Sequence, residues 1–297
     1  LFRDTGKIET RVSPDILDSE LAKREIAAIL RCDLSLMIST VEIDYLTRFF
    51  QVPPTQLQYV PFMEEMTDAH STAPFAQRAH FISIGNFRHD PNWDAVRYLK
   101  ETLWPLIRQQ LPQTELHVYG AYPPKKATQL HNERSGFLVK GWAPDAQQVV
   151  SQARVMLAPL RFGAGLKGKL IDAARNGTPA VTTSIGAEAM YGDDAPPCAL
   201  VADTPEAFAL AAVGLYQNED QWRPLHHNGL RLLEQRFSFA TYAPRLIQRI
   251  TELRAMLDEH RKAHFYGQML RHHSLKSTRF MAQWIEAKNR LKKNDTE

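Results

Sequence analysis

The chain has 297 residues, with 36 Lys or Arg, 33 Asp or Glu, a net charge of +3 and two cysteines, Cys32 and Cys198. This length supplies a core for one domain and part of another, and two cysteines are too few for a disulfide framework, which is consistent with a reducing cytoplasm. No apolar run approaches the ~20 residues that span a bilayer, which argues against an integral membrane protein.

The first 62 residues predict alternating helices and strands. Ser13 and Pro14 are typical of an N-cap and a first helical position, and the helix that they begin carries Leu17, Leu21 and Ile29 along one side. The pattern then predicts in turn a strand, a helix and a second strand, over Leu34–Ile38, Val41–Phe50 and Leu57–Phe62.

From Phe81 onward, short apolar runs alternate strictly with helical patterns. The runs that we predict as strands are Phe81–Ile84, Leu116–Tyr119, Phe137–Val139, Val155–Leu160, Ala180–Thr183 and Ala199–Val201. The helices predicted between them are Asn92–Leu111, Pro124–Arg134, Ala146–Gln152, Gly168–Arg175 and the short Glu188–Tyr191. Such alternation predicts an α/β fold with a doubly wound parallel sheet and helices on both faces.

A glycine follows five of these apolar runs. Because ligands bind beyond the carboxyl ends of the strands in such sheets, these glycines predict a binding cleft along one edge. They are Gly85, Gly120, Gly141, Gly163 and Gly186.

The segment after the fourth strand carries the strongest chemical signal. Gly163 and Gly165 allow backbone N–H groups to approach an anion, and the helix behind them points its positive end toward the same place. Lys167 and Lys169 add positive charges that are misplaced at a helix start unless an anion binds there. Lys169 and Asp172 share a helix face, whereas Lys167 converges with them only if it precedes the helix. We predict a diphosphate site with a carboxylate for ribose.

Several segments together resemble the C-terminal half of a two-domain GT-B glycosyltransferase of the family 4, or group 1, type. The similarity covers roughly Ser39 to Leu246, and the segments that carry it are ISIGNFRHDPNWDAVRYL, LHVYGA, FLVKGWAPD, VMLAPLRFGAGLKGKLIDAARNGTPAVTTSIGAEAM and LEQRFSFATYAPRL. The resemblance implies a Rossmann-like donor domain that uses a nucleotide-diphosphate sugar as substrate and no further cofactor. The sequence has no Asp-x-Asp pair of the metal-dependent glycosyltransferase fold, so we expect no metal.

The resemblance also implies roles for single residues. Lys167 and Lys169 are the expected catalytic cations, and Asp172 is the expected ribose ligand. The other expected donor-binding residues are Gly85, Gly163 and Gly165 at the diphosphate, Gly141 and Trp142 near the base, and Gly186 and Glu188 near the sugar.

Two departures from the family pattern limit what the resemblance implies. Members often carry a further acid that seven residues separate from the ribose ligand, and at that position this chain has Ala164. They also usually have Glu at the position of Asp172. Glu188 is a candidate to replace the missing acid in part. A hexosyltransferase of the retaining type is implied, but the donor and the stereochemistry stay open.

The resemblance divides the chain into the end of an acceptor domain and linker at 1–70, a donor domain at 71–245 and a basic helical tail at 246–297. We therefore expect a fragment of a longer glycosyltransferase, inactive alone, that acts in bacterial cell-surface polysaccharide biosynthesis on a saccharide, lipid-linked or protein acceptor. Two alternatives are a non-catalytic sugar-nucleotide-binding protein and a nucleotide-sugar 2-epimerase of the same fold. No feature indicates nucleic acid as a partner.

The tail differs from the remainder in charge. Residues 261–297 hold nine Lys or Arg against three acids, a net +6, so the remainder carries −3. Phe280, Trp284 and Leu291 recur at helical spacing, with Met281 and Ile285 beside them. Such a helix lies on an anionic membrane surface or docks its apolar stripe on the first domain or on a second copy, and we favour docking. The expected location is cytoplasmic, with the inner face of the membrane as the peripheral alternative.

Overall fold

The structure of the chain is a computed structural model that describes residues 19–65, 73–191 and 196–294, with side chains up to residue 288. Contacts divide these residues into two compact units. Pro61–Ala243 forms the first, which we call the sheet unit; residues 19–60 and 244–294 form the second, which we call the helical unit.

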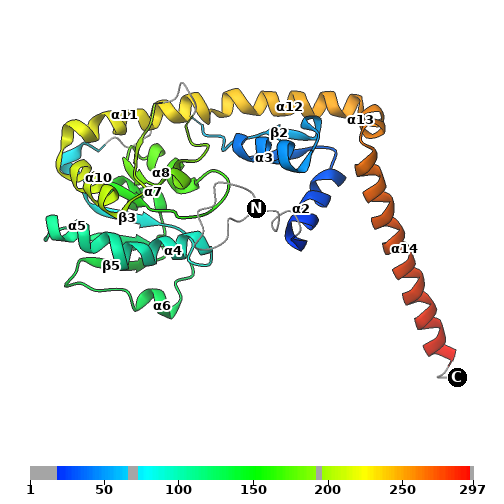
Figure 1. The fold of residues 1–297 in the computed structure, drawn as a ribbon, viewed down its shortest axis with the longest axis horizontal. Helices are drawn as coiled ribbons and strands as arrows, with labels where there is room; N and C mark the ends of the chain where they lie inside the picture. Colours follow the sequence, from blue (N-terminus) through cyan, green and yellow to red (C-terminus); the bar gives the residue numbers. More distant parts are fainter. Residues whose placement is uncertain (1–18, 66–72, 192–195, 295–297) are drawn as a thin grey trace. The chain divides into compact units, whose positions relative to one another are not determined.

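The sheet unit is built on six parallel strands (Figure 1). They are β3 (Ala79–Ile84), β4 (Leu116–Tyr119), β5 (Phe137–Gly141), β6 (Ala153–Ala158), β7 (Ala180–Thr182) and β8 (Ala199–Val201). Their order across the sheet is β5-β4-β3-β6-β7-β8, so the chain builds one half outward from β3, then crosses back and builds the other half outward from β6. The predicted doubly wound parallel sheet is confirmed.

Two groups of helices pack with this sheet. One comprises α4 (Asp90–Tyr98), the π-helical η3 (Leu99–Leu103), α5 (Trp104–Gln110) and α10 (Pro205–Gln217). The other comprises α7 (Ala146–Gln152), α8 (Gly168–Arg175) and α11 (Glu219–Arg236), while α6 (Lys125–Thr128) and α9 (Ser184–Ala187) are single turns. The helix α12 (Phe239–Ala255) begins in the sheet unit, and its later part belongs to the helical unit.

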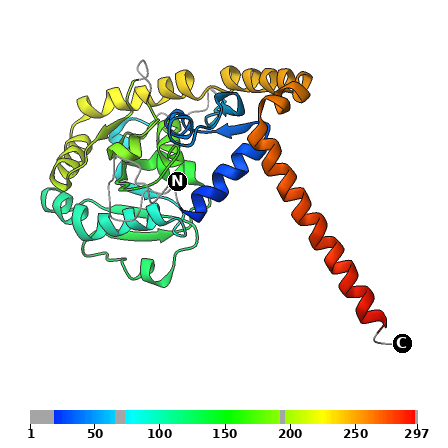
Figure 2. The same ribbon diagram turned by 45° about the vertical axis from the view of Figure 1, so that its right-hand side comes forward.

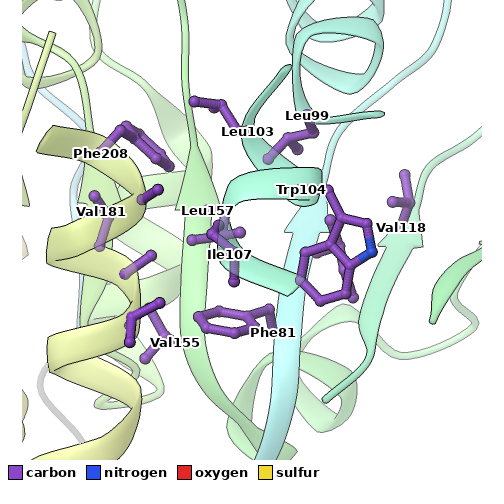
Figure 3. Packing of buried hydrophobic residues seen from close by; sticks show 14 of the residues in the cluster. Phe81, Leu99, Leu103, Trp104, Ile107, Val118, Val155, Leu157, Val181 and Phe208 are labelled. Atoms are coloured by element: carbon purple, nitrogen blue, oxygen red, sulfur yellow. The ribbon is translucent and has the colours of Figure 1, made fainter. Parts of the chain in front are cut away.

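Alternating side chains of the strands supply the core. Phe81, Val155 and Val181 belong to the buried cluster that includes η3, α5 and α10, and Figure 3 shows Phe81 beside Ile107 and Trp104. The intervening Ile82 and Met156 are also buried but belong to the opposite side of the pleat. Both faces of the sheet are therefore covered, as the continuous apolar runs predict.

The predicted helices are correct in place but not always in extent, except for the short helix predicted at Glu188–Tyr191. The expected single helix at Asn92–Leu111 contains the π-helical segment Leu99–Leu103 just before Pro105. Proline lacks an N–H and clashes with the carbonyl four residues earlier, and the wider π turn accommodates it.

Two other helix predictions are wrong, one in its length and the other in its position. Only Lys125–Thr128 of the expected Pro124–Arg134 is helical, because the Asn132 side chain accepts from the backbone N–H of Ser135 and forms a turn into β5. The short helix expected at Glu188–Tyr191 instead spans Ser184–Ala187. The hydroxyl of Thr183 caps it by accepting from the N–H of Gly186 at 3.1 Å.

A buried arginine connects the start of β3 to the end of α8. The Arg78 side chain is 1% exposed and donates to the carbonyls of Ala73, Ala153 and Asn176 and to the hydroxyl of Thr178, at 2.7–3.3 Å. Burial lowers the pKa of Arg78 to about 10. Four acceptors thus replace the water that this guanidinium loses.

The helical unit contains a small parallel pair, β1 (Ser35–Met37) with β2 (Leu57–Tyr59), where two strands were predicted. Its helices in chain order are α2 (Glu20–Arg31), α3 (Thr40–Phe50), η1 (Pro54–Gln56), α13 (Leu257–Ala263) and α14 (Phe265–Asn294). The helix start expected at Ser13–Pro14, and Leu17, lie outside the described residues. Leu21 is 58% exposed, whereas Ile29 packs on the Leu46, Val52 and Leu57 cluster, so these two residues do not form one buried side.

An ion cluster fastens α13 and α14 to the segment after α2. The carboxylate of Asp33 accepts from Arg261 at 3.0 and 2.8 Å and from Arg271 at 2.6 Å. The hydrogen bond from Arg261, followed by that from Arg271, holds the pKa of Asp33 at about 2. Because the folded state favours the charged form, this contribution is complete above the unfolded pKa of about 4 and disappears as the pH falls through about 2.

Replacement of Asp33 by asparagine is expected to lower the free energy of unfolding at pH 7 by about 1 kcal/mol, after discounting for solvent screening of a partly exposed group. The difference between the two proteins should shrink between pH ~5 and ~2. Urea unfolding at several pH values measures it. Asp44→Asn, which removes the exposed pair with Arg48, is the matched control. An equal loss in both variants would contradict the assignment to the ion cluster.

Candidate nucleotide-binding site

The candidate site lies where the strand order reverses. The β3 and β6 strands are neighbours, but the chain leaves them toward opposite sides of the sheet, so the loops after them separate at their carboxyl ends. A cavity of about 270 Å³ opens there. Its lining contains five of the predicted residues, Gly85, Gly163, Lys167, Lys169 and Asp172, together with His89, Pro91, Asn92 and the neighbouring apolar residues.

The loop before α8 has the backbone that its glycines predict. Gly163 has φ +132° and Gly165 has φ +69°, which are conformations that residues with a β-carbon rarely adopt. An ion pair connects this loop to α4, because Arg161 binds Asp94 of that helix through two hydrogen bonds of 2.8 and 2.5 Å. This pair spans 67 positions along the chain and was not predicted from the sequence.

Lys167 lies in the turn, as convergence with Lys169 requires. It is the N-cap residue of α8, with φ −95° and ψ 93°, and the regular helix begins one residue later. Its side chain is 8% exposed, and its ammonium donates to the carbonyl of Gly165. The lysine therefore folds back over the glycine turn at the cavity.

Lys169 lies in the first turn of α8 and is half-buried. Its Nζ donates to Oδ1 of Asn92 at 2.8 Å. Burial, and next the positive charge of Lys167, lower the pKa of Lys169 to about 8. Two ammonium groups thus crowd the positive end of a helix, an arrangement that an anion in the cavity would stabilise.

Asn92 is the functional candidate that the sequence analysis missed. Its amide oxygen accepts from Lys169, and its amide nitrogen donates to the carbonyl of Asn86 at 3.1 Å. It also packs on Gly85, where an added β-carbon would lie 2.7 Å from Cγ of Asn92. The side chain therefore joins the loop after β3 to the cation of α8. The only local signal was its place in the first turn of a helix behind a glycine loop.

Asp172 follows one turn after Lys169 and also lines the cavity. Its Oδ1 accepts from Arg175 at 2.9 Å, and Arg175 in turn binds Glu64 at 2.8 and 2.5 Å. Burial raises the pKa of Asp172, and the nearby Arg175 opposes this shift. Arg175 thus holds the Asp172 carboxylate through Oδ1 at the edge of the cavity.

The remaining predicted residues do not line this cavity. Gly141 has φ +77° at the end of β5, and Trp142 beside it is 66% exposed. Gly186 is buried in α9, and Glu188 is the half-buried C-cap of that helix. Gly165 contacts the site through its carbonyl.

Residues 78–218 match the family described as glycosyl transferases group 1. We call the matched segment the group 1 domain, and its fold is that of GT-B glycosyltransferases. No curated protein matches the chain.

Solved structures of glycosyltransferases share the fold of this domain at low sequence identity. A mutant of TarM from S. aureus, in complex with Fondaparinux, alpha-GlcNAc-glycerol and UDP, is 12% identical over 78% of this chain and 46% of its own, with a TM-score of 0.64. The pneumococcal O-GlcNAc transferase GtfA, in complex with UDP and GlcNAc, is 15% identical over 85% and 50%, with a TM-score of 0.60. Anabaena Alr3699/HepE, in complex with UDP, is 11% identical over 82% and 70%, with a TM-score of 0.64. The chain spans about half the length of TarM and GtfA.

Within the ranges that the structure describes, no helix is long and apolar enough to cross a membrane. The same residues contain no group of three or more His, Cys, Asp or Glu side chains arranged to hold a metal ion. Metal independence of the group 1 domain stays a prediction.

Proposed function

We propose that the group 1 domain binds a nucleotide-diphosphate sugar and is the donor-binding part of a glycosyltransferase. The observation that supports this most is the convergence of Lys167, Lys169 and the Gly163 turn on one cavity at the reversal of strand order. UDP is the first candidate nucleotide, because the similar TarM, GtfA and HepE structures contain it.

The proposed chemistry follows from the charges. When the bond between the sugar carbon and the diphosphate oxygen breaks, negative charge develops on the departing diphosphate while the sugar becomes oxocarbenium-like. The ammonium groups of Lys167 and Lys169 and the amides near Gly163 and Gly85 are fixed in advance and stabilise that charge. Asp172 accepts from a ribose hydroxyl.

The contacts to the base and the sugar belong to the same proposal. Gly141 and Trp142 are assigned to the base, and Gly186 and Glu188 to the donor sugar. These four residues lie outside the lining of the cavity. The acceptor is a saccharide, a lipid-linked molecule or a protein, and cell-surface polysaccharide assembly is the proposed setting. WaaG, a structure of similar fold at 16% identity with a TM-score of 0.54, is described as involved in lipopolysaccharide biosynthesis.

The cytoplasm is the proposed location. Cys32 and Cys198 are both free thiols. Burial raises the pKa of Cys198 to about 11, so that thiol is inert at neutral pH.

Isothermal titration of this chain with UDP, GDP, ADP and dTDP tests the proposal. At least one nucleoside diphosphate is expected to bind, with the same affinity in the presence and absence of EDTA, because lysines and backbone amides supply the positive charge. Absence of binding to all four would contradict the donor site. A loss of affinity in EDTA would contradict metal independence alone.

Activity assays separate the alternatives. Sugar transfer to an added acceptor by the longest available form of the protein supports a transferase, an epimerised nucleotide sugar indicates an epimerase, and binding without turnover indicates a non-catalytic protein. The expectation that this 297-residue chain is inactive alone stays a prediction that the same assay checks.

A further inference from the structure

The C-terminal helix α14 changes its surroundings along its length. Its first part packs on α2: Arg271 donates to the carbonyl of Arg31 at 2.6 Å, and Arg31 donates to the hydroxyl of Ser274 at 2.9 Å. From Leu275 to Lys288, every described side chain is exposed. Figures 1 and 2 both show this part of α14 extending away from α2.

The exposed part carries an apolar stripe on one side. Phe280, Met281, Trp284 and Ile285, which we call the C-terminal stripe, follow helical spacing and are 45–64% exposed. Leu275 is equally apolar but lies about half a turn away from Trp284, so it faces another direction. The side chain of Leu291 lies outside the described part of the chain.

The charge of the same segment is mostly positive. Residues 275–288 contain Lys276, Arg279 and Lys288 against the single acid Glu286. The ammonium of Lys288 lies 4.8 Å from the ring centroid of Trp284, so a cation lies directly beside the stripe. An apolar stripe bordered by cations fits an interface that is apolar inside and anionic at its surface.

In place of the protein docking that the sequence pattern favoured, we propose that α14 docks on an anionic lipid bilayer through the C-terminal stripe. Charge complementarity favours this partner over a second copy of the chain. If two copies packed stripe to stripe, the three cations of one segment would face the three cations of the other, and each segment has only one acid to offset them. The aromatic side chains lie at the level of the lipid headgroups, and the cations contact lipid phosphates. This inference does not depend on the donor site in the sheet unit.

Vesicle flotation of the full 297-residue chain tests the proposal. Binding is expected to vesicles of phosphatidylcholine with about a quarter phosphatidylglycerol, and to be weaker by at least about tenfold for phosphatidylcholine alone or at high salt. The double variant Phe280→Ser with Trp284→Ser should lose binding by a similar factor. Leu275→Ser, on the other side of the helix, is the matched control and should bind like the unaltered chain.

All the altered side chains are exposed, so the far-ultraviolet circular dichroism and melting temperature of the variants should match those of the unaltered chain. Light scattering without vesicles gives the mass in solution. Three results would each overturn the proposal. They are failure of the chain to bind anionic vesicles, equal binding by the double variant, and a dimer in solution that is lost in the double variant. Nucleotide binding by the double variant should be unchanged, which keeps this test separate from that of the donor site.

Discussion

Replacement of Lys169 by methionine is expected to weaken nucleoside diphosphate binding by about 10- to 150-fold, or about 1.5–3 kcal/mol, the range for hydrogen bonds to charged groups. Methionine keeps an apolar stem in the half-buried position next to Asn92 but removes the charge that faces the cavity. Titration calorimetry at pH 7 measures the change. Lys262→Met, on the exposed surface of the helical unit, is the control and should bind normally.

The same lysine predicts a pH dependence. In the free protein the pKa of Lys169 is about 8, and a bound diphosphate would raise it. Affinity should therefore be constant below pH 8, where the ammonium is protonated in both states, and should fall as the pH rises above 8, by up to about tenfold per unit. Lys169→Met should remove this fall. If the variant keeps the pH dependence or the full affinity, Lys169 does not contact the phosphates.

Replacement of Arg78 by methionine is expected to lower the free energy of unfolding by about 3 kcal/mol. The substitution leaves three buried carbonyls and the Thr178 hydroxyl without this donor, and each unsatisfied buried group costs about 1–3 kcal/mol, offset in part because a desolvated charge disappears. A fall in melting temperature of about 6–12 °C follows for a unit of this size.

Thermal unfolding followed by circular dichroism measures the effect of the Arg78 substitution. Arg78→Lys should recover less than half of the loss, because a single ammonium cannot reproduce the planar fork that reaches four acceptors. Nucleotide affinity measured well below the melting temperature should stay near that of the unaltered chain, since Arg78 does not line the cavity. A melting temperature within about 2 °C of the unaltered chain would contradict the structural role.

Local pattern was sufficient for the sheet and for the main loop of the site. Each of the six strands overlaps a predicted apolar run, because buried parallel strands are continuously apolar. The turn at Gly163 and Gly165 was equally visible, since two positive φ angles demand glycine.

The side-chain contacts that hold the site together could not be predicted from local sequence patterns. Lys169–Asn92, Arg161–Asp94 and Arg175–Glu64 join residues 77, 67 and 111 positions apart, and no periodicity in one sequence encodes such pairs. The helix limits failed for a related reason. Asn132 and Thr183 each use a side chain to bind a nearby backbone N–H, and this local competition outweighs helix periodicity.

The hydrogen bond between Asn92 and Lys169 fixes a flexible side chain before any ligand arrives. A free lysine side chain loses up to about 2 kcal/mol of rotamer entropy when it is immobilised, and here that loss occurs on folding rather than on binding. Among the residues that the structure describes, Asn92 takes one of the three N–H donors of the ammonium, which leaves two for oxygens in the cavity. An anion that binds in the proposed site would therefore meet a lysine that is already ordered, and the affinity that Lys169 contributes would not be reduced by the need to order it.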